Sequence, residues 1–131
     1  MSTINWLDLL DWGKDQLEDL RFIGFAYIKE GKYDIAKTFF EAIITLSPNN
    51  AYDLQTLGAI YLQEGKNLEA LTYIDKALLF TPKHSETLLN RAKALFSLGY
   101  KKQGISQANV LLSCENKNIA NQAQALISAF A

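Results

Sequence analysis

The chain has 131 residues, of which 49 % are hydrophobic and 21 % are charged, and its formal net charge is -1. This length fits one domain, and the lack of a basic excess argues against a nucleic-acid partner. We expect no membrane insertion, because no apolar run reaches the length of a membrane-spanning helix. A single cysteine cannot form an internal disulfide, and the amino terminus lacks the pattern of a secretory signal. We therefore expect a cytoplasmic protein.

The chain begins with a short apolar leader. Residues 1–14 predict an N-terminal helix, although so short a helix is only marginally stable alone. The leader must therefore fold back on the chain or bury itself in another chain, and both interpretations stay open. The apolar side chains available for such a contact are Ile4, Trp6, Leu7, Leu10 and Trp12.

A 34-residue spacing governs the sequence after the leader. The stretch YIKEGKYDIAKTFF, residues 27–40, returns in register as YLQEGKNLEALTYI, residues 61–74. The same spacing relates Gly31, Gly65 and Gly99, and it relates Pro48 to Pro82. A fixed period of this length is typical of architectures built from stacked repeats.

Each unit predicts two helices. Apolar residues at helical spacing fill both halves of a unit, and a glycine between them ends the first helix. The units span residues 17–50, 51–84 and 85–116. The third is degenerate, because Arg91 occupies a usual apolar position, Gly104 replaces an alanine, and Asn116 stands in place of the proline. Residues 117–131 predict a capping helix that covers the last pair.

These small, aromatic and proline positions resemble the tetratricopeptide repeat family. The resemblance implies an all-α fold, an α-solenoid of three helix pairs with a short N-terminal helix and a C-terminal capping helix. Fold alone says little about function.

Catalytic chemistry is not expected. His84 follows Pro82 in a turn and is interpreted as a solvated loop residue, and Cys114 is interpreted as a small buried apolar residue. Neither has a partner with which to form a catalytic or metal-binding group. We expect no enzyme, no cofactor and no metal.

The first helices of the units predict a partner-binding groove. In such a solenoid they face the concave side, where aromatic side chains can anchor a partner's helix or extended segment. Phe22, Phe25 and Phe96 are expected to be the most exposed, and packing between repeats is the alternative explanation for this strip. The groove residues are Phe22, Phe25, Ile28, Lys29, Tyr52, Gln55, Ala59, Leu62, Leu89, Asn90, Lys93 and Phe96.

Two functions are compared on this basis. The stretches 27–48 and 92–113 resemble the small chaperones of bacterial type III secretion, which implies a chaperone that holds a translocator or needle subunit, as a homodimer or with a co-chaperone. The alternative is a structural adaptor subunit of a larger assembly. Domains that clamp the carboxyl terminus of heat-shock chaperones use basic inner positions, and Phe25 and Glu86 disagree with that pattern.

Overall fold

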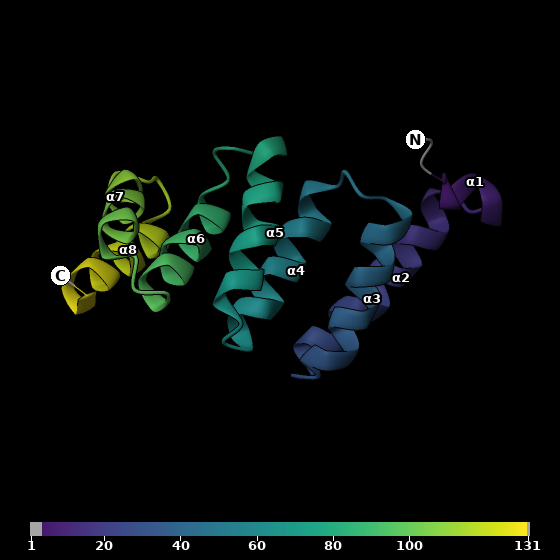
Figure 1. The fold of residues 1–131 in the computed structure, drawn as a ribbon, viewed down its shortest axis with the longest axis horizontal. Helices are drawn as coiled ribbons and strands as arrows, with labels where there is room; N and C mark the ends of the chain where they lie inside the picture. The colour runs from purple at the N-terminus through teal and green to yellow at the C-terminus, as the bar shows by residue number, and fades with distance from the viewer. Residues whose placement is uncertain (1–3, 131) are drawn as a thin grey trace.

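The computed structural model describes residues 4–130, and within them every element is a helix (Figure 1). The first three residues of the predicted leader and the last residue of the predicted capping helix lie outside this range. None of the described helices is both long and apolar enough to cross a membrane. The helices are α1 (Trp6–Leu10), α2 (Lys14–Lys29), α3 (Tyr33–Leu46), α4 (Ala51–Gln63), α5 (Asn67–Phe80), α6 (Ser85–Ser97), α7 (Lys101–Leu111) and α8 (Lys117–Phe130).

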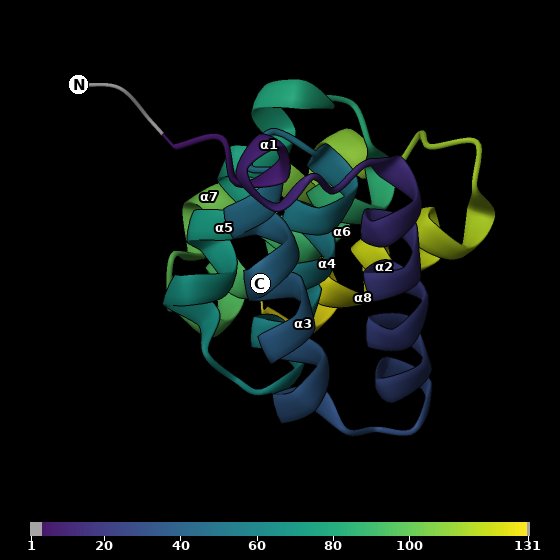
Figure 2. The ribbon, with the colours of Figure 1, turned by 90° about the vertical axis from the view of Figure 1, so that its right-hand side faces the viewer.

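The helices form three stacked pairs. Helix α2 packs on α3, α4 on α5 and α6 on α7, while α1 lies at one end of the stack and α8 at the other (Figure 1). Viewed along the stack, α2, α4 and α6 lie on one side and α3, α5 and α7 on the other (Figure 2). This arrangement confirms the predicted α-solenoid with a short N-terminal helix and a C-terminal helix.

The turn inside each pair is the same. Gly31, Gly65 and Gly99 have φ of 75°, 77° and 85°, the left-handed conformation in which a side chain would be strained. Each glycine N–H donates to the carbonyl three residues back, and the next N–H donates to the carbonyl five residues back. This double closure ends the first, inner helix of each pair and leads into the second, outer helix.

Small residues let the two helices of a pair approach closely. A Cβ on Gly24 would lie 2.8 Å from the Phe40 ring, and a Cβ on Gly58 would lie 2.9 Å from Ile74 Cγ1. Phe40 and Ile74 are fully buried. The glycines of this column therefore provide the space that the large core residues of the outer helices fill.

In the third pair the glycine lies on the second helix and the large core residue on the first, the reverse of the other two pairs. A Cβ on Gly104 in α7 would lie 2.8 Å from the Phe96 ring of α6. At the same two positions the first pair carries Ile28 and Ala36. The larger aromatic ring on the inner helix is thus accommodated by the loss of a methyl group on the outer helix.

Two groups of buried residues form much of the core. One includes Leu17, Phe40, Ile43, Leu57 and Ile60 and joins the first pair to α4. The other joins the third pair to α8 and consists of Leu89, Ala92, Phe96, Ala108, Leu111, Ile119 and Ala123. Cys114 is partly buried and packs against this second group, in line with its interpretation as an apolar packing residue.

Helix α1 is shorter than the predicted leader helix. It begins after Asn5, whose side chain accepts a hydrogen bond from the Asp8 N–H, and it ends at Asp11, which has φ of 55°. Leu7 packs against the first core group. Most of the other apolar leader side chains stay accessible, with Ile4 62 % and Leu9 67 % exposed. The leader therefore packs on the first pair through Leu7 and leaves several of its apolar side chains accessible.

Candidate partner-binding groove

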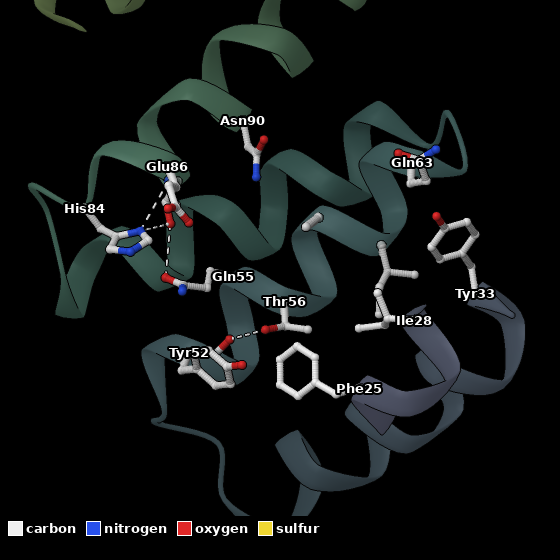
Figure 3. A pocket seen from close by; sticks show the side chains of 13 residues that line it. Phe25, Ile28, Tyr33, Tyr52, Gln55, Thr56, Gln63, His84, Glu86 and Asn90 are labelled. Atoms are coloured by element: carbon white, nitrogen blue, oxygen red, sulfur yellow. Dashed lines mark hydrogen bonds between the residues drawn. The ribbon is translucent and has the colours of Figure 1, made fainter. Parts of the chain in front are cut away.

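A hollow of about 400 Å³ lies on the side of the solenoid formed by α2, α4 and α6 (Figure 3). We call it the central hollow. Helix α4 forms its floor, α2 with the start of α3 forms one wall, and the start of α6 forms the other. Its lining consists of Phe25, Ile28, Tyr33, Tyr52, Gln55, Thr56, Ala59, Ile60, Gln63, His84, Glu86, Thr87 and Asn90.

The wall from the first pair is apolar. The Phe25 ring meets the buried Phe40 ring edge-on, with centroids 5.6 Å apart, and lies 5.5 Å from the Tyr52 ring. Ile28 and Tyr33 continue this wall (Figure 3). Because Phe25 is held from two sides, it presents a fixed aromatic surface, and fixed aromatic surfaces are good anchors for a partner.

The wall from α6 is polar and is organised by His84. His84 Nδ1 accepts a hydrogen bond from the Thr87 N–H and so caps α6. The Thr87 hydroxyl lies 2.8 Å from His84 Nδ1 and donates to Gln55 Oε1 at 3.1 Å, which ties α6 to α4. Glu86 and Asn90 lie on the same wall, opposite Phe25 and Ile28 (Figure 3).

Two further hollows continue the central one. The N-terminal hollow shares Phe25 and Tyr52 with it and adds Glu18, Arg21, Phe22 and Asn50. The C-terminal hollow shares Ala59, Gln63 and Asn90 with it and adds Leu62, Gly65, Asn67, Lys93, Ser97, Leu126 and Phe130. The three hollows adjoin one another along the side of the solenoid from α2 to α8, and we call them together the groove.

Arg21 is not free to meet a partner in this groove. Its Nε and Nη2 donate hydrogen bonds of 2.7 Å to the two carboxylate oxygens of Asp53, which is fully buried. The hydrogen bonds that Arg21 donates to Asp53 raise the pKa of Arg21, and the attraction to Asp53 and Glu18 adds to that shift. The positive charge of Arg21 therefore balances a buried negative charge at the junction of the first two pairs.

Most of the predicted groove residues line the groove. Phe22 is 78 % exposed and Phe25 is partly buried at its centre. Lys29 is exposed but lines none of the three hollows. The predicted residues that do line the groove are Phe22, Phe25, Ile28, Tyr52, Gln55, Ala59, Leu62, Asn90 and Lys93.

Phe96 and Leu89 were predicted on the groove surface, and these predictions are wrong. Each is 4 % exposed and belongs to the second core group. The cause is α8, which packs on α6 and stacks Phe130 on Phe96 with centroids 4.8 Å apart. The sequence contained an indication of this burial. Gly104 leaves room for the Phe96 ring, whereas an alanine at position 104 would clash with it.

Seven residues that line the central hollow were absent from the predicted groove set, namely Tyr33, Thr56, Ile60, Gln63, His84, Glu86 and Thr87. Tyr33 begins an outer helix, and only the tight turn at Gly31 brings it to the groove. His84 was expected to be solvated and is instead a partly buried cap. The signal for a cap was its position directly before a helix that carries a glutamate in its first turn.

The comparison with protein families matches the geometry. The tetratricopeptide repeat model matches residues 22–50 and 54–84. Two segments of this chain therefore match tetratricopeptide repeats. The matched ranges cover most of the first two helix pairs, while the pair α6–α7 lies beyond them. Among curated proteins, none matches this sequence.

Solved structures of two chaperones superpose on most of the chain. PcrH of Pseudomonas aeruginosa, bound to the chaperone binding region of PopD, has a TM-score of 0.80 and 25 % identity over 90 % of this chain and 92 % of that chain. The type III secretion chaperone SycD of Yersinia enterocolitica, with a peptide of the translocator YopD, has a TM-score of 0.82 and 20 % identity over 90 % and 94 %.

A second group of similar structures binds a different peptide. The second repeat domain of human RPAP3, in complex with the HSP70 peptide SGPTIEEVD, has a TM-score of 0.76 and 25 % identity over 88 % of this chain and 94 % of that chain. The chain thus has the fold of domains whose structures hold peptides from several different proteins.

Proposed function

We propose that this tetratricopeptide repeat chain is a cytoplasmic chaperone that holds a segment of an export substrate in its groove before secretion. The substrate we propose is a translocator or needle subunit of type III secretion. This proposal rests mainly on the three adjoining hollows of the groove, with Phe25 held between Phe40 and Tyr52 where two of them meet. The bound PopD and YopD segments of PcrH and SycD support a client of this kind.

The side chains that line the groove are suited to binding a client segment without changing it chemically. Apolar contacts with Phe25, Ile28 and Tyr52 would shield a client segment from water, and the amides of Gln55 and Asn90 would hydrogen-bond its backbone. Such contacts form and break without covalent chemistry or nucleotide. An export apparatus could therefore remove the client intact.

The test is to block the groove without disturbing its support. Ala59 lies on the floor where the central and C-terminal hollows meet, so Ala59→Trp places a large ring in the path of a client. The exported subunits are co-expressed from the same genome as this chain. We expect the amount that co-purifies with Ala59→Trp to be at least about tenfold lower than with the wild type. Leu79→Trp is the matched control, because Leu79 is 80 % exposed on α5 and lines none of the hollows of the groove.

Two results contradict this proposal. One is a wild-type chain that retains none of the co-expressed subunits. The other is an Ala59→Trp variant that retains them as well as wild type, with circular dichroism showing that both are folded. In the second case the client lies elsewhere on the surface.

The exposed leader favours the second candidate, a structural adaptor fixed in an assembly. Trp6, Leu9 and Leu10 are 38 %, 67 % and 45 % exposed, and Trp6 lines a hollow formed with the end of α3. Apolar groups gathered in this way mark a contact with another chain, such as a homodimer partner, a co-chaperone or an assembly subunit. Light scattering on the isolated chain separates the candidates, because a chaperone stays soluble as a monomer or dimer and an adaptor without its assembly aggregates.

A further inference from the structure

The groove is asymmetric across its width. In the central hollow the apolar side chains of Phe25, Ile28 and Tyr33 face the polar wall of His84, Glu86 and Asn90, with α4 between them (Figure 3). A segment that fills this hollow therefore meets an apolar surface on one side and a polar surface on the other.

The polar wall carries a negative charge. Among the described residues that line the central hollow, Glu86 alone is an acidic or strongly basic side chain. In the neighbouring N-terminal hollow Glu18 is acidic and lies 4.0 Å from Arg21, which is also bound by the buried Asp53, so these three groups together leave one negative charge. Lys93 brings a positive charge only at the C-terminal hollow. The two hollows nearest α2 thus present negative charge to whatever enters them.

Glu86 has no partner within residues 4–130. The ion pairs of the described chain join other groups, including Lys37 with Glu64 and Arg91 with Asp75. A purely apolar client lying over Glu86 would take water from its carboxylate without returning a counter-charge, which is unfavourable. A lysine or arginine at that point of the client would restore the lost interaction.

We infer that the groove selects a client segment that is apolar on one side and basic on the other, with a lysine or arginine facing Glu86. This inference rests on the proposed function and adds the charge of the client to it. It also places this chain opposite to the RPAP3 domain that binds SGPTIEEVD, a peptide with three acidic residues. Acidic segments of that kind would be repelled by Glu86 and Glu18.

The experiment presents the purified chain with a pool of short random-sequence peptides whose ends are blocked. Bound peptides are sequenced by mass spectrometry. We expect enrichment of peptides that combine large apolar residues with lysine or arginine, and depletion of those with aspartate or glutamate, by about two- to fivefold. The bias should weaken at high salt, because the charges lie at the mouth of the groove.

Charge reversal at Glu86 identifies the source of the bias. Glu86→Lys should remove the enrichment of basic peptides and favour acidic ones. Glu69→Lys is the matched control, since Glu69 is also an acidic residue in the first turn of a helix, α5, but lines none of the hollows of the groove. The control should keep the basic preference of the wild type.

The outcomes separate the inference from the proposed function. Enrichment of apolar peptides without a basic preference, or a preference unchanged by Glu86→Lys, overturns the inference and leaves a peptide-holding groove. If the wild type enriches no peptides, or if Ala59→Trp enriches the same peptides as the wild type, the groove is not the binding site and the proposed function fails with the inference.

Discussion

Arg21 and Asp53 join the first two helix pairs through two parallel hydrogen bonds of 2.7 Å, and the Asp53 carboxylate has no exposure to solvent. The next junction carries the equivalent contact 34 residues later, between Gln55 and Thr87 at 3.1 Å. An ion pair at one junction thus corresponds to a neutral hydrogen bond at the other. Both hold neighbouring inner helices at a fixed distance along the groove.

The buried pair gives the first prediction. Arg21→Met leaves the Asp53 charge buried and uncompensated, so we expect the free energy of unfolding to fall by about 3–5 kcal/mol. The double variant Arg21→Met with Asp53→Leu should recover most of that loss, because no buried charge remains. Urea denaturation measures both. A double variant as unstable as the single one would show that the pair contributes through its geometry and not through charge balance.

Phe96 and Gly104 give the second prediction. Gly104→Ala drives a methyl group into the Phe96 ring, and we expect a loss of about 1–3 kcal/mol in unfolding free energy. Adding Phe96→Leu, which restores the combination of Leu62 and Ala70 in the second pair, should return about 1 kcal/mol of it. Thermal unfolding of the double-mutant cycle tests this coupling. Strict additivity of the two changes would contradict it.

The left-handed glycines give the third prediction. Gly31→Ala should cost about 1 kcal/mol of stability, and Gly65→Ala should cost the same, because a Cβ at either position meets no atom within 4 Å. The penalty then comes from the backbone conformation alone. Asparagine tolerates this conformation better, so Gly31→Asn should be milder in the same urea titration. An alanine variant as stable as wild type would contradict the backbone argument.

Tyr61 gives a prediction about alkaline pH. Burial raises the pKa of Tyr61 to about 12, and its hydrogen bond to Glu41 and the charge of Glu41 act in the same direction. The unfolded chain loses this proton near pH 10, the ordinary value for tyrosine. The neutral phenol therefore stabilises the fold fully below about pH 10, and this contribution is lost as the pH rises to about 12.

The matching variant isolates this effect. Tyr61→Phe keeps the ring that stacks on Tyr73 at 5.6 Å but has no proton to lose. We expect its unfolding free energy to fall less steeply than that of the wild type between pH 10 and 12. Equal slopes would show that other groups account for the alkaline loss.

The architecture could be predicted from the sequence because the 34-residue spacing places the same residue types at equivalent turns and helix contacts in successive pairs. The glycines at 31, 65 and 99 occupy equivalent turns, and Gly24 and Gly58 occupy equivalent close approaches. Such positions depend only on neighbours within one pair, so the 34-residue spacing was enough to place them.

The groove could be predicted only in part, because its edges depend on elements outside the repeat. Of the three rings predicted to be most exposed, Phe22 is exposed, Phe25 lines the groove but is half-buried, and Phe96 is covered by α8. Which side of α6 would face α8 cannot be derived from periodicity within the pairs. The same holds for Arg21, whose charge is taken up by Asp53 from the next pair.

The two core groups described above share no residue, and within the described chain no part of α2 packs on α6. The first and last thirds of the rod are therefore linked through the middle pair alone. A client segment bound in the groove would contact α2, α4 and α6 at once and so stabilise the relative position of the three pairs. Without a client, the first and third pairs should therefore move relative to each other about the middle pair. A bound client should reduce this motion and make the first and third pairs unfold in one cooperative transition.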